Sequence, residues 1–216
     1  MDKRFLAIIG VIIVLFIGFL FLRGDGGGGS TTAEPTNHVK GAGTAGVTLL
    51  EYGDFQCPAC AAYYPAIENL VASYGDQITF QFRHFPLVSI HPNAFGASRA
   101  AEAASKQGKF WEMYNKIYQG QTTWKDQSNP NDTFNTYAQQ IGLNLEQFKT
   151  DFRSSPVGAA INADVKAGND LGVSSTPTFF LNGELVQTPP TATAEADFRA
   201  LIDAAIAAQG SSADKE

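Results

Sequence analysis

The sequence predicts an α/β fold with a helical insertion, preceded by one N-terminal transmembrane helix. Three observations predict this fold class. Apolar strands flank a helix between residues 47 and 82, a helical stretch of about 85 residues follows at 88–172, and a hairpin and a helix close the domain. Alternating strands and helices indicate parallel strand pairs, whereas a hairpin indicates an antiparallel edge, so we expect a mixed sheet.

The N-terminal segment predicts a membrane anchor. Residues 5–22 are an uninterrupted run of 18 apolar residues or glycines, which as a helix span about 27 Å, close to the thickness of a bilayer's hydrocarbon core. A cleaved secretory signal has a shorter apolar region and a small-x-small cleavage site, so the pattern favours an uncleaved signal-anchor over residues 1–23. Lys3 and Arg4 before the run predict a cytoplasmic N-terminus, a single pass through the cell membrane and an extracytoplasmic domain.

A change of composition separates this anchor from the domain. Residues 24–46 are rich in Gly, Ser, Thr and Ala, which bury too little apolar surface to offset the entropy lost on ordering, so we expect a flexible tether. His38 lies in this tether and receives no predicted role. We expect the domain to occupy residues 47–210 and residues 211–216 to form a polar tail.

The first part of the domain is predicted to be strand, helix, strand. Val47–Tyr52 is apolar and β-branched, as expected of a buried strand. Alanines and apolar residues at helical spacing follow from Cys57 to Tyr74, and Gly75 is a good helix stop. Ile78–Phe82 alternates in polarity and is predicted to be the second strand.

The rest of the domain is predicted to be helical until a hairpin. Helical spacing marks five segments in the insertion, namely 92–107, 110–118, 132–141, 144–152 and 156–171. Thr178–Leu181 then has strand character, and Asn182-Gly183 predicts a tight hairpin turn into residues 184–187. A final helix is expected at 193–208.

Net charge and cysteine content exclude one class of partner and one kind of structural framework. The chain carries a net charge of −6, and the excess of acidic residues lies after residue 25. A domain this acidic lacks the basic surface that binds phosphate backbones, so we expect no nucleic acid partner. The cysteines number two, Cys57 and Cys60, which excludes a framework of several disulfides.

The two cysteines lie in Cys57-Pro58-Ala59-Cys60, between the first strand and the first helix. Proline is favoured at the first position of a helix, which makes Cys57 the N-cap and puts Cys60 one turn further in. Free backbone N–H groups and the positive end of the helix dipole then stabilise a Cys57 thiolate. The pattern predicts a redox pair in which Cys57 is the nucleophile and Cys60 is the resolving thiol.

Three other interpretations of the pair explain less. A structural disulfide closes a loop of only a few residues and removes little entropy from the unfolded chain. A zinc site needs two further ligands, and six residues separate His84 from His91, outside the usual spacing, so we predict no metal. If the two cysteines were buried and inert, their close spacing in an exported chain would have no explanation.

A second feature is Thr176-Pro177-Thr178, which directly precedes the returning strand. A cis peptide bond between Thr176 and Pro177 turns the chain sharply and places it beside the cysteines. The N–H and C=O groups of Thr176 then remain free to pair with an extended substrate. The alternative is a trans proline that starts an edge strand.

These segments resemble a known family, the DsbA-like thiol:disulfide oxidoreductases of the thioredoxin superfamily, over about Val47 to Ala208. The resemblance is carried by Glu51-Tyr52-Gly53-Asp54-Phe55-Gln56-Cys57-Pro58-Ala59-Cys60 and by Thr176-Pro177-Thr178-Phe179-Phe180. It implies a thioredoxin-like fold with the helical insertion that these proteins carry. It also implies that Cys57 attacks, that Cys60 resolves and that Pro177 is the cis-proline.

The resemblance further assigns Glu51 as a buried acid that relays a proton to or from Cys60. A solvent-facing strand residue is the alternative for Glu51. We expect substrate chains to contact the loop of Thr176 and Pro177 and the Pro58-Ala59 pair between the cysteines. Strong oxidants of the family carry histidine where this chain has Ala59. Since alanine offers neither a donor nor a charge, we expect Cys57 to be less acidic than in those proteins.

The implied function is an oxidase that donates the Cys57–Cys60 disulfide to exported proteins with free cysteines. The resemblance implies a quinone-linked membrane protein as the partner that re-oxidises the pair, and no cofactor. A reductase or isomerase that uses the same cysteines, a non-catalytic chaperone-like binding module and a metal-delivery protein are the alternatives.

Overall fold

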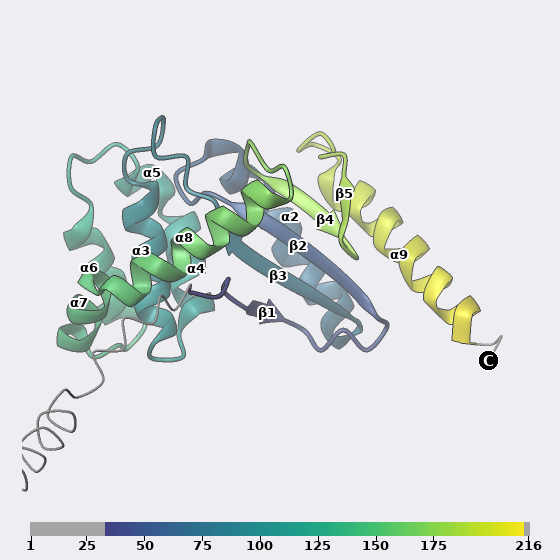
Figure 1. Cartoon of the computed structure of the whole chain (residues 1–216), viewed down its shortest axis with the longest axis horizontal. Helices are drawn as coiled ribbons and strands as arrows, with labels where there is room; N and C mark the ends of the chain where they lie inside the picture. The colour runs from purple at the N-terminus through teal and green to yellow at the C-terminus, as the bar shows by residue number, and fades with distance from the viewer. Residues whose placement is uncertain (1–32, 214–216) are drawn as a thin grey trace, which may run out of the picture. The chain divides into compact units, whose positions relative to one another are not determined.

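The computed structural model describes residues 33–213, which form one five-stranded sheet with helices packed on it and a group of helices at one end (Figure 1). The strands are β1 (His38–Lys40), β2 (Val47–Gly53), β3 (Ile78–His84), β4 (Thr178–Leu181) and β5 (Glu184–Val186). The helices are α2 (Pro58–Tyr74), the 3-10 turn η1 (Gly75–Gln77), α3 (Ala94–Ser105), α4 (Phe110–Gln119), α5 (Gln121–Trp124), α6 (Asn131–Gln140), α7 (Leu145–Arg153), α8 (Ser155–Asp170) and α9 (Ala194–Ala213).

The sheet is mixed, as the order of predicted elements indicates. Its strand order is β1-β3-β2-β4-β5, in which β2 and β3 are parallel and every other pair is antiparallel. The helix α2 connects the two parallel strands, because parallel neighbours need a crossover connection. The long helical insertion runs from β3 to β4 and ends with α8, so β4 returns beside β2.

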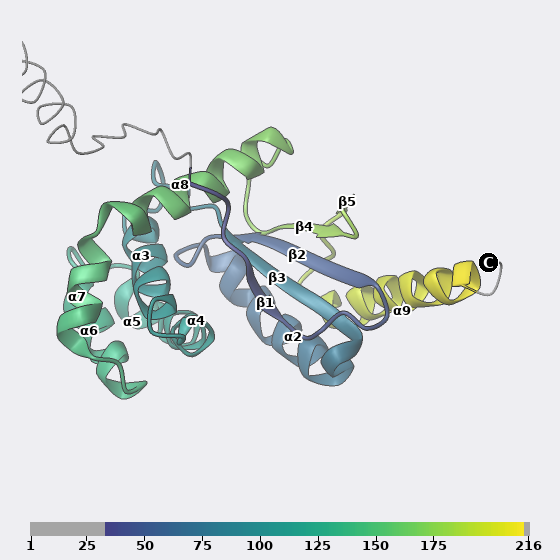
Figure 2. The same cartoon turned by 60° about the horizontal axis from the view of Figure 1, so that its bottom comes forward.

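Different helices pack on the two faces of the sheet. Along β2, side chains alternate between faces, and Val47 and Leu49 belong to the main core with residues of α2 and α9. Tyr52 belongs to a second cluster, with Val165 of α8 against it. Figure 2 shows α2 on one side of the sheet and α8 on the other. Glu51 is in step with Val47 and Leu49, so its side chain lies on the α2 face.

Local sequence signals set the ends of two elements. Gly75 caps α2 with a positive φ of 55°, a conformation that costs glycine least. In the hairpin between β4 and β5, Asn182 and Gly183 have φ values of 50° and 84°. Positive φ at both central residues is the requirement of a type I′ turn, which Asn-Gly meets best, so the predicted hairpin is confirmed.

The insertion forms its own helical layer around buried aromatic and alanine side chains. The predicted segments correspond to α3, α4, α6, α7 and α8. The four-residue helix α5 is absent from the prediction, because a single turn shows no helical period. Its Trp124 is fully buried, packs against Phe134 of α6 and donates from its indole N–H to the carbonyl oxygen of Ile117 at 2.9 Å.

The prediction that residues 24–46 form a flexible tether is wrong from residue 33 onward. His38–Lys40 is strand β1, paired antiparallel with β3 in the register His38 to Phe82. A strand of three residues is too short to produce a recognisable pattern, and its order comes from tertiary contacts. Thr36, two residues earlier, is held by two hydrogen bonds of 2.7 Å to the carboxylate of Asp164 in α8.

The C-terminal boundary also differs from the prediction. The last helix continues to Ala213, so residues 211–213 of the predicted polar tail are helical. Alanine and serine in this stretch carry no strong helix stop. The anchor predicted at residues 5–22 lies outside the described residues. Among residues 33–213, no helix combines the length and the apolar character needed to cross a bilayer.

Candidate active site

Cys57 is the N-cap of α2, and Pro58 is the first residue of that helix, as the sequence predicts. The backbone of Cys57 is extended, with φ −64° and ψ 122°, and its amide donates to the carbonyl oxygen of Asp54 at 3.1 Å. Pro58 and Ala59 are exposed beside it. The two cysteines are free thiols in the structure, which therefore describes the reduced pair.

The environment of Cys57 stabilises a thiolate. A hydrogen bond from Cys60 is the largest influence on its pKa, and hydrogen bonds from Thr176 and from the amides of Cys60 and Ala59 add to it. Partial burial opposes these contacts, and the net result lowers the pKa of Cys57 from 9.0 to about 5. Cys57 is thus ionised at neutral pH and nucleophilic. The strong oxidant DsbA has a cysteine pKa of about 3.5. A pKa of about 5 for Cys57 agrees with the expectation, drawn from Ala59, that Cys57 is less acidic than in such oxidants.

Cys60 has the opposite character. It is 1% exposed, and burial, together with its hydrogen bond to Cys57 and the charges of Glu51 and Cys57, raises its pKa well above 9.0. The amide of Asp54 donates to its sulfur at 3.5 Å. At neutral pH the pair therefore holds one thiolate and one thiol. Cys57, at 6% exposure, is the more accessible of the two sulfurs as well as the more reactive one, which is the division of roles that thiol exchange needs.

The loop before β4 lies against the pair. The Thr176–Pro177 peptide bond is cis, in agreement with the prediction. The sulfur of Cys57 lies 3.4 Å from the carbonyl oxygen of Thr176, although 119 residues separate the two in sequence. The structure thus brings together the two motifs that the sequence singles out.

Glu51 is buried on β2 beneath α2, which decides between its two interpretations. Glu51 is 2% exposed, so the alternative of a solvent-facing strand residue is wrong. Burial is the main cause that raises the pKa of its carboxyl to about 8, and the charges of Cys57 and Glu68 raise it further. A carboxylic acid of this pKa holds a proton at neutral pH and can exchange it with a neighbouring group.

Asp54 is a site residue that sequence reasoning does not assign. It is fully buried, and its carboxylate accepts from the amide of Gln56 at 2.7 Å, the amide of Leu87 at 2.9 Å and Nδ1 of His91 at 2.7 Å. These bonds tie the turn before Cys57 to the loop that follows β3. The turn lies in the cysteine motif, but Leu87 and His91 are more than 30 residues away from Asp54, so no local signal indicates these two contacts.

Side chains of the insertion also fix this turn. Gln121 of α5 donates from Nε2 to the carbonyl oxygens of Phe55 at 2.8 Å and Cys57 at 3.0 Å. Gln56 in turn donates from Nε2 to the carbonyl oxygen of Lys125 at 2.7 Å and accepts from the amide of Asn93 at 2.6 Å. Buried amide groups of this kind fix a backbone in one conformation. The helical insertion therefore helps to shape the cysteine turn.

The difference between the two thiols predicts a pH profile for alkylation. Because only the thiolate reacts, the rate at which iodoacetamide modifies the reduced chain should rise around pH 5 and level off by about pH 7, with Cys57 as the labelled residue. Peptide mapping of the alkylated chain checks the position. In the control variant Cys57→Ser, labelling should begin only in alkaline solution, where Cys60 ionises. A midpoint near 9 for Cys57 would contradict the described contacts.

Comparison with known sequences gives two results. The thioredoxin family model matches residues 33–204. The chain is also 40% identical over 157 residues to a Na(+)/H(+) antiporter NhaA 1 from Mycolicibacterium gilvum, a match that covers 71% of this chain and 24% of the antiporter. A Na(+)/H(+) antiporter NhaA from Herminiimonas arsenicoxydans is 33% identical over 147 residues, covering 68% of this chain and 22% of the antiporter. The chain spans about a quarter of the length of the curated relatives that it matches.

Solved structures share the fold at lower identity. A thioredoxin-like oxidoreductase from Silicibacter pomeroyi has a TM-score of 0.65 at 24% identity, covering 80% of this chain and 93% of that chain. Oxidised BdbD from Bacillus subtilis has a TM-score of 0.66 at 20% identity, covering 81% and 97%. Alpha-DsbA1 from Wolbachia pipientis has a TM-score of 0.65 at 19% identity, covering 81% and 93%.

Proposed function

Because the chain belongs to the thioredoxin family, we propose that it is a protein thiol:disulfide oxidoreductase whose Cys57–Cys60 pair exchanges disulfides with substrate thiols. The observation that carries this proposal is the Cys57 sulfur. It lies at the start of α2, has a pKa of about 5, and lies against the carbonyl oxygen of Thr176. A thiolate there is both a nucleophile and a good leaving group, and an extended substrate chain can pair with the backbone of the Thr176 loop beside it.

We propose that the pair works as an oxidase. A substrate thiolate attacks the Cys57 sulfur of the Cys57–Cys60 disulfide, which breaks the bond and releases Cys60 as a thiolate that takes up a proton. The second substrate thiolate then attacks the mixed disulfide and displaces Cys57. The substrate is oxidised by two electrons, and the pair is left as one thiol and one thiolate. A low pKa for Cys57 favours this direction, because it stabilises the reduced pair.

The substrate surface in this proposal surrounds Cys57. Val88 and Ile90 are 57% and 67% exposed in the loop that Asp54 binds through Leu87 and His91. Exposed apolar side chains in this loop suit an unfolded polypeptide with free cysteines better than a small thiol. We propose newly exported polypeptides as the substrates. A quinone-linked membrane protein is the proposed acceptor that re-oxidises the pair.

The reduction potential tests the proposed direction. A thiol pKa of about 5 falls between about 7 for thioredoxin and about 3.5 for DsbA. We therefore expect a potential between about −270 and −120 mV, measured by equilibration with glutathione buffers and quantified by alkylation of free thiols. The oxidised chain should also restore disulfides to a reduced, unfolded test protein. A potential at or below about −270 mV, with efficient insulin reduction, would favour the reductase.

We also propose that residues 5–22 anchor the domain outside the cytoplasm. The proposal rests on the apolar run and on Lys3 and Arg4 before it. In intact cells a membrane-impermeant maleimide should label Cys57 after mild reduction, and alkaline carbonate washing should leave the chain in the membrane fraction. A variant without residues 1–23 should be soluble and unlabelled. Labelling that requires cell lysis would contradict this orientation.

The match to the antiporters adds no function to this proposal. It covers about a quarter of each antiporter, so it gives no basis for proposing ion transport.

A further inference from the structure

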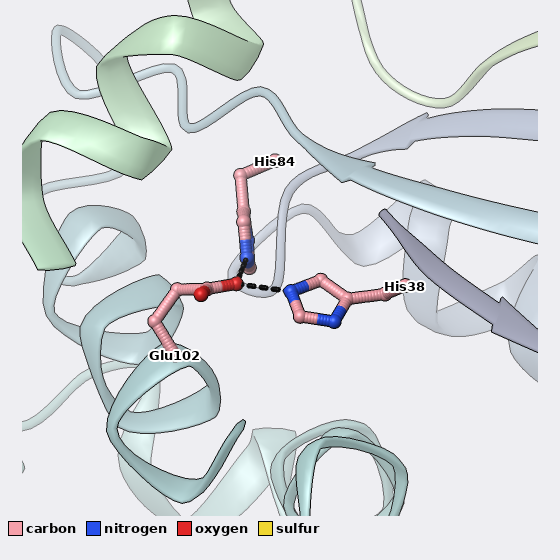
Figure 3. A group of neighbouring side chains, drawn as sticks. All are labelled: His38, His84 and Glu102. Atoms are coloured by element: carbon pink, nitrogen blue, oxygen red, sulfur yellow. Dashed lines mark hydrogen bonds and ion pairs between the residues drawn. The ribbon is translucent and has the colours of Figure 1, made fainter. Parts of the chain in front are cut away.

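Two histidines and a glutamate from separate parts of the chain meet in the interior (Figure 3). His38 comes from β1, His84 from the end of β3 and Glu102 from α3. Nε2 of His84 lies 2.8 Å from Oε1 of Glu102, and Nε2 of His38 contacts the same oxygen. The two nitrogens and the oxygen all lie within 4.8 Å of one another. This His38–His84–Glu102 cluster contains neither cysteine and has no role in the proposed thiol exchange.

Aromatic packing holds the two imidazoles in place. The ring of His38 stacks on Phe110 with centroids 3.5 Å apart and an interplanar angle of 5°. The ring of His84 meets Phe55, Phe82 and Phe110 at centroid distances of 5.4 to 5.9 Å. The side chain of His84 is fully buried and that of Glu102 is 5% exposed, whereas that of His38 is 12% exposed. Solvent therefore reaches the cluster past His38.

One buried carboxylate holds the backbone beside both histidines. Asp164 of α8 accepts from the amide and the hydroxyl of Thr36, two residues before His38, and from the amide of His84 at 2.9 Å. Strand pairing between β1 and β3 adds a second restraint, since His38 is opposite Phe82. The three side chains therefore converge from a backbone that is already fixed. Fixed geometry of this kind is what distinguishes a built site from a chance contact.

We propose that His38, His84 and Glu102 form a binding site for a divalent transition metal ion, with Zn²⁺ as the best fit. Two imidazole nitrogens and one carboxylate oxygen are a recurring zinc set, in which a solvent molecule completes four ligands. Calcium and magnesium prefer shells of oxygen ligands, so nitrogen ligands argue against them. The ion takes the place of the protons that the imidazoles otherwise share with the carboxylate.

The charge of the cluster suits a cation. Burial alone would raise the pKa of Glu102, but hydrogen bonds from the two histidines lower it to about 2. The carboxylate is therefore ionised at neutral pH and accepts from both imidazoles. The ionised carboxylate gives the cluster a negative charge that a divalent ion compensates, at a place partly open to solvent past His38. Bound metal would join β1 to α3 and β3.

The surroundings of Nδ1 of His84 determine the metal affinity that we expect. A metal on Nε2 of His84 leaves the proton on Nδ1, and Nδ1 has no hydrogen-bond partner among the described residues. Histidines that bind metal usually donate from this nitrogen, and loss of such a partner weakens affinity by about 10- to 100-fold. We therefore expect reversible binding, weaker than in zinc sites whose outer hydrogen bonds are complete.

The cysteines must be prevented from binding metal in the test. The full chain is first oxidised, so that a Cys57–Cys60 disulfide offers no thiolate, and the absence of free thiols is confirmed with a thiol reagent. Co²⁺ is then titrated as a spectroscopic probe, followed by Zn²⁺ in competition. We expect one Co²⁺ per chain, visible absorption of a nitrogen and oxygen site without a sulfur charge-transfer band, displacement by Zn²⁺, and a higher melting temperature with Zn²⁺.

Variants assign the ligands. His38→Gln, at the partly exposed edge of the cluster, and Glu102→Gln should each weaken Zn²⁺ binding by at least about tenfold. The matched control is His91→Gln, which removes a histidine paired with Asp54 outside the cluster and should leave Zn²⁺ binding unchanged. Circular dichroism verifies that each variant is folded, and His38→Gln suffices if Glu102→Gln does not fold. The proposal fails if the oxidised chain binds no Co²⁺ or Zn²⁺, or if His38→Gln binds Zn²⁺ as tightly as the natural chain.

Discussion

Replacing Cys57 with serine should abolish disulfide exchange. A serine hydroxyl is neither ionised nor able to form a mixed disulfide, so the rate of disulfide transfer to a reduced test protein should fall by at least about a thousandfold. The thiolate with a pKa of about 5 is the only group in the described site with the required nucleophilicity. The measurement is the recovery of activity by a reduced, unfolded protein that needs its disulfides.

Cys60→Ser is the matched control for this loss. It keeps the nucleophile at the start of α2 and removes the resolving thiol. The reduced variant is mixed with a disulfide-bonded test protein, and Cys57 should attack that disulfide, displace one thiol of the test protein and remain joined to the other in a mixed disulfide that gel electrophoresis detects without reductant. Cys57→Ser should form none. If both variants trapped substrate equally, the assignment of roles would be wrong. If Cys57→Ser kept its full function in cells, the chain would instead act as a non-catalytic binding module.

Replacing Glu51 with glutamine should stabilise the fold at neutral pH. The pKa of Glu51 is about 8 in the folded chain and near 4.5 when unfolded. Below pH 4.5 the carboxyl is protonated in both states. As pH rises toward 8, the unfolded state loses the proton while the folded state keeps it, so folded stability falls. The loss at pH 7 amounts to about 3 kcal/mol, and Glu51→Gln should recover it.

The pH dependence separates this effect from ordinary packing changes. Urea unfolding of the reduced chain should show little difference between Glu51→Gln and the natural chain at pH 4, and a difference that grows toward pH 8. Glu184→Gln is the control, because that side chain is exposed on β5 and should behave like the natural chain at every pH. A constant difference across the range would mean that the Glu51 carboxyl ionises normally.

The same variant tests the proposed proton relay. Glu51 lies near enough to Cys60 for its charge to raise the pKa of that thiol. Glutamine keeps the size of the side chain but cannot exchange a proton, so the steps that protonate or deprotonate Cys60 should slow by up to about a hundredfold. Stopped-flow measurement of reoxidation over a range of pH detects this, whereas a purely structural role would leave its pH profile unchanged.

The sequence predicts the reactive centre well because its determinants are local. Proline after Cys57 defines the start of a helix within three residues, and the spacing to Cys60 gives one helical turn. Asn182-Gly183 similarly defines its own turn. The contact between Cys57 and Thr176 is distant in sequence, and the Thr176-Pro177-Thr178 motif and the family resemblance together indicate it.

The parts that the sequence misses depend on long-range contacts. His38 lies in a stretch whose composition is typical of a linker, yet β3, Glu102 and Asp164 order it. Glu102 looks like one more polar residue on an alanine-rich helix. The spacings of 64 and 18 residues between Glu102 and the two histidines match no metal motif. Only the folded chain shows that these residues are neighbours.

The hydrogen bonds that Gln121 donates and that Asp54 accepts have a consequence for the architecture. The bonds from Gln121 and from His91 cross between the insertion and the cysteine turn, so the catalytic sheet and the inserted helices are not independent modules. A minimised protein made by deleting residues 88–172 would lose the support of its own reactive loop. Transplanting the four-residue cysteine motif to a smaller scaffold would likewise leave this support behind. Engineering of the reactivity therefore has to begin from the whole folded unit.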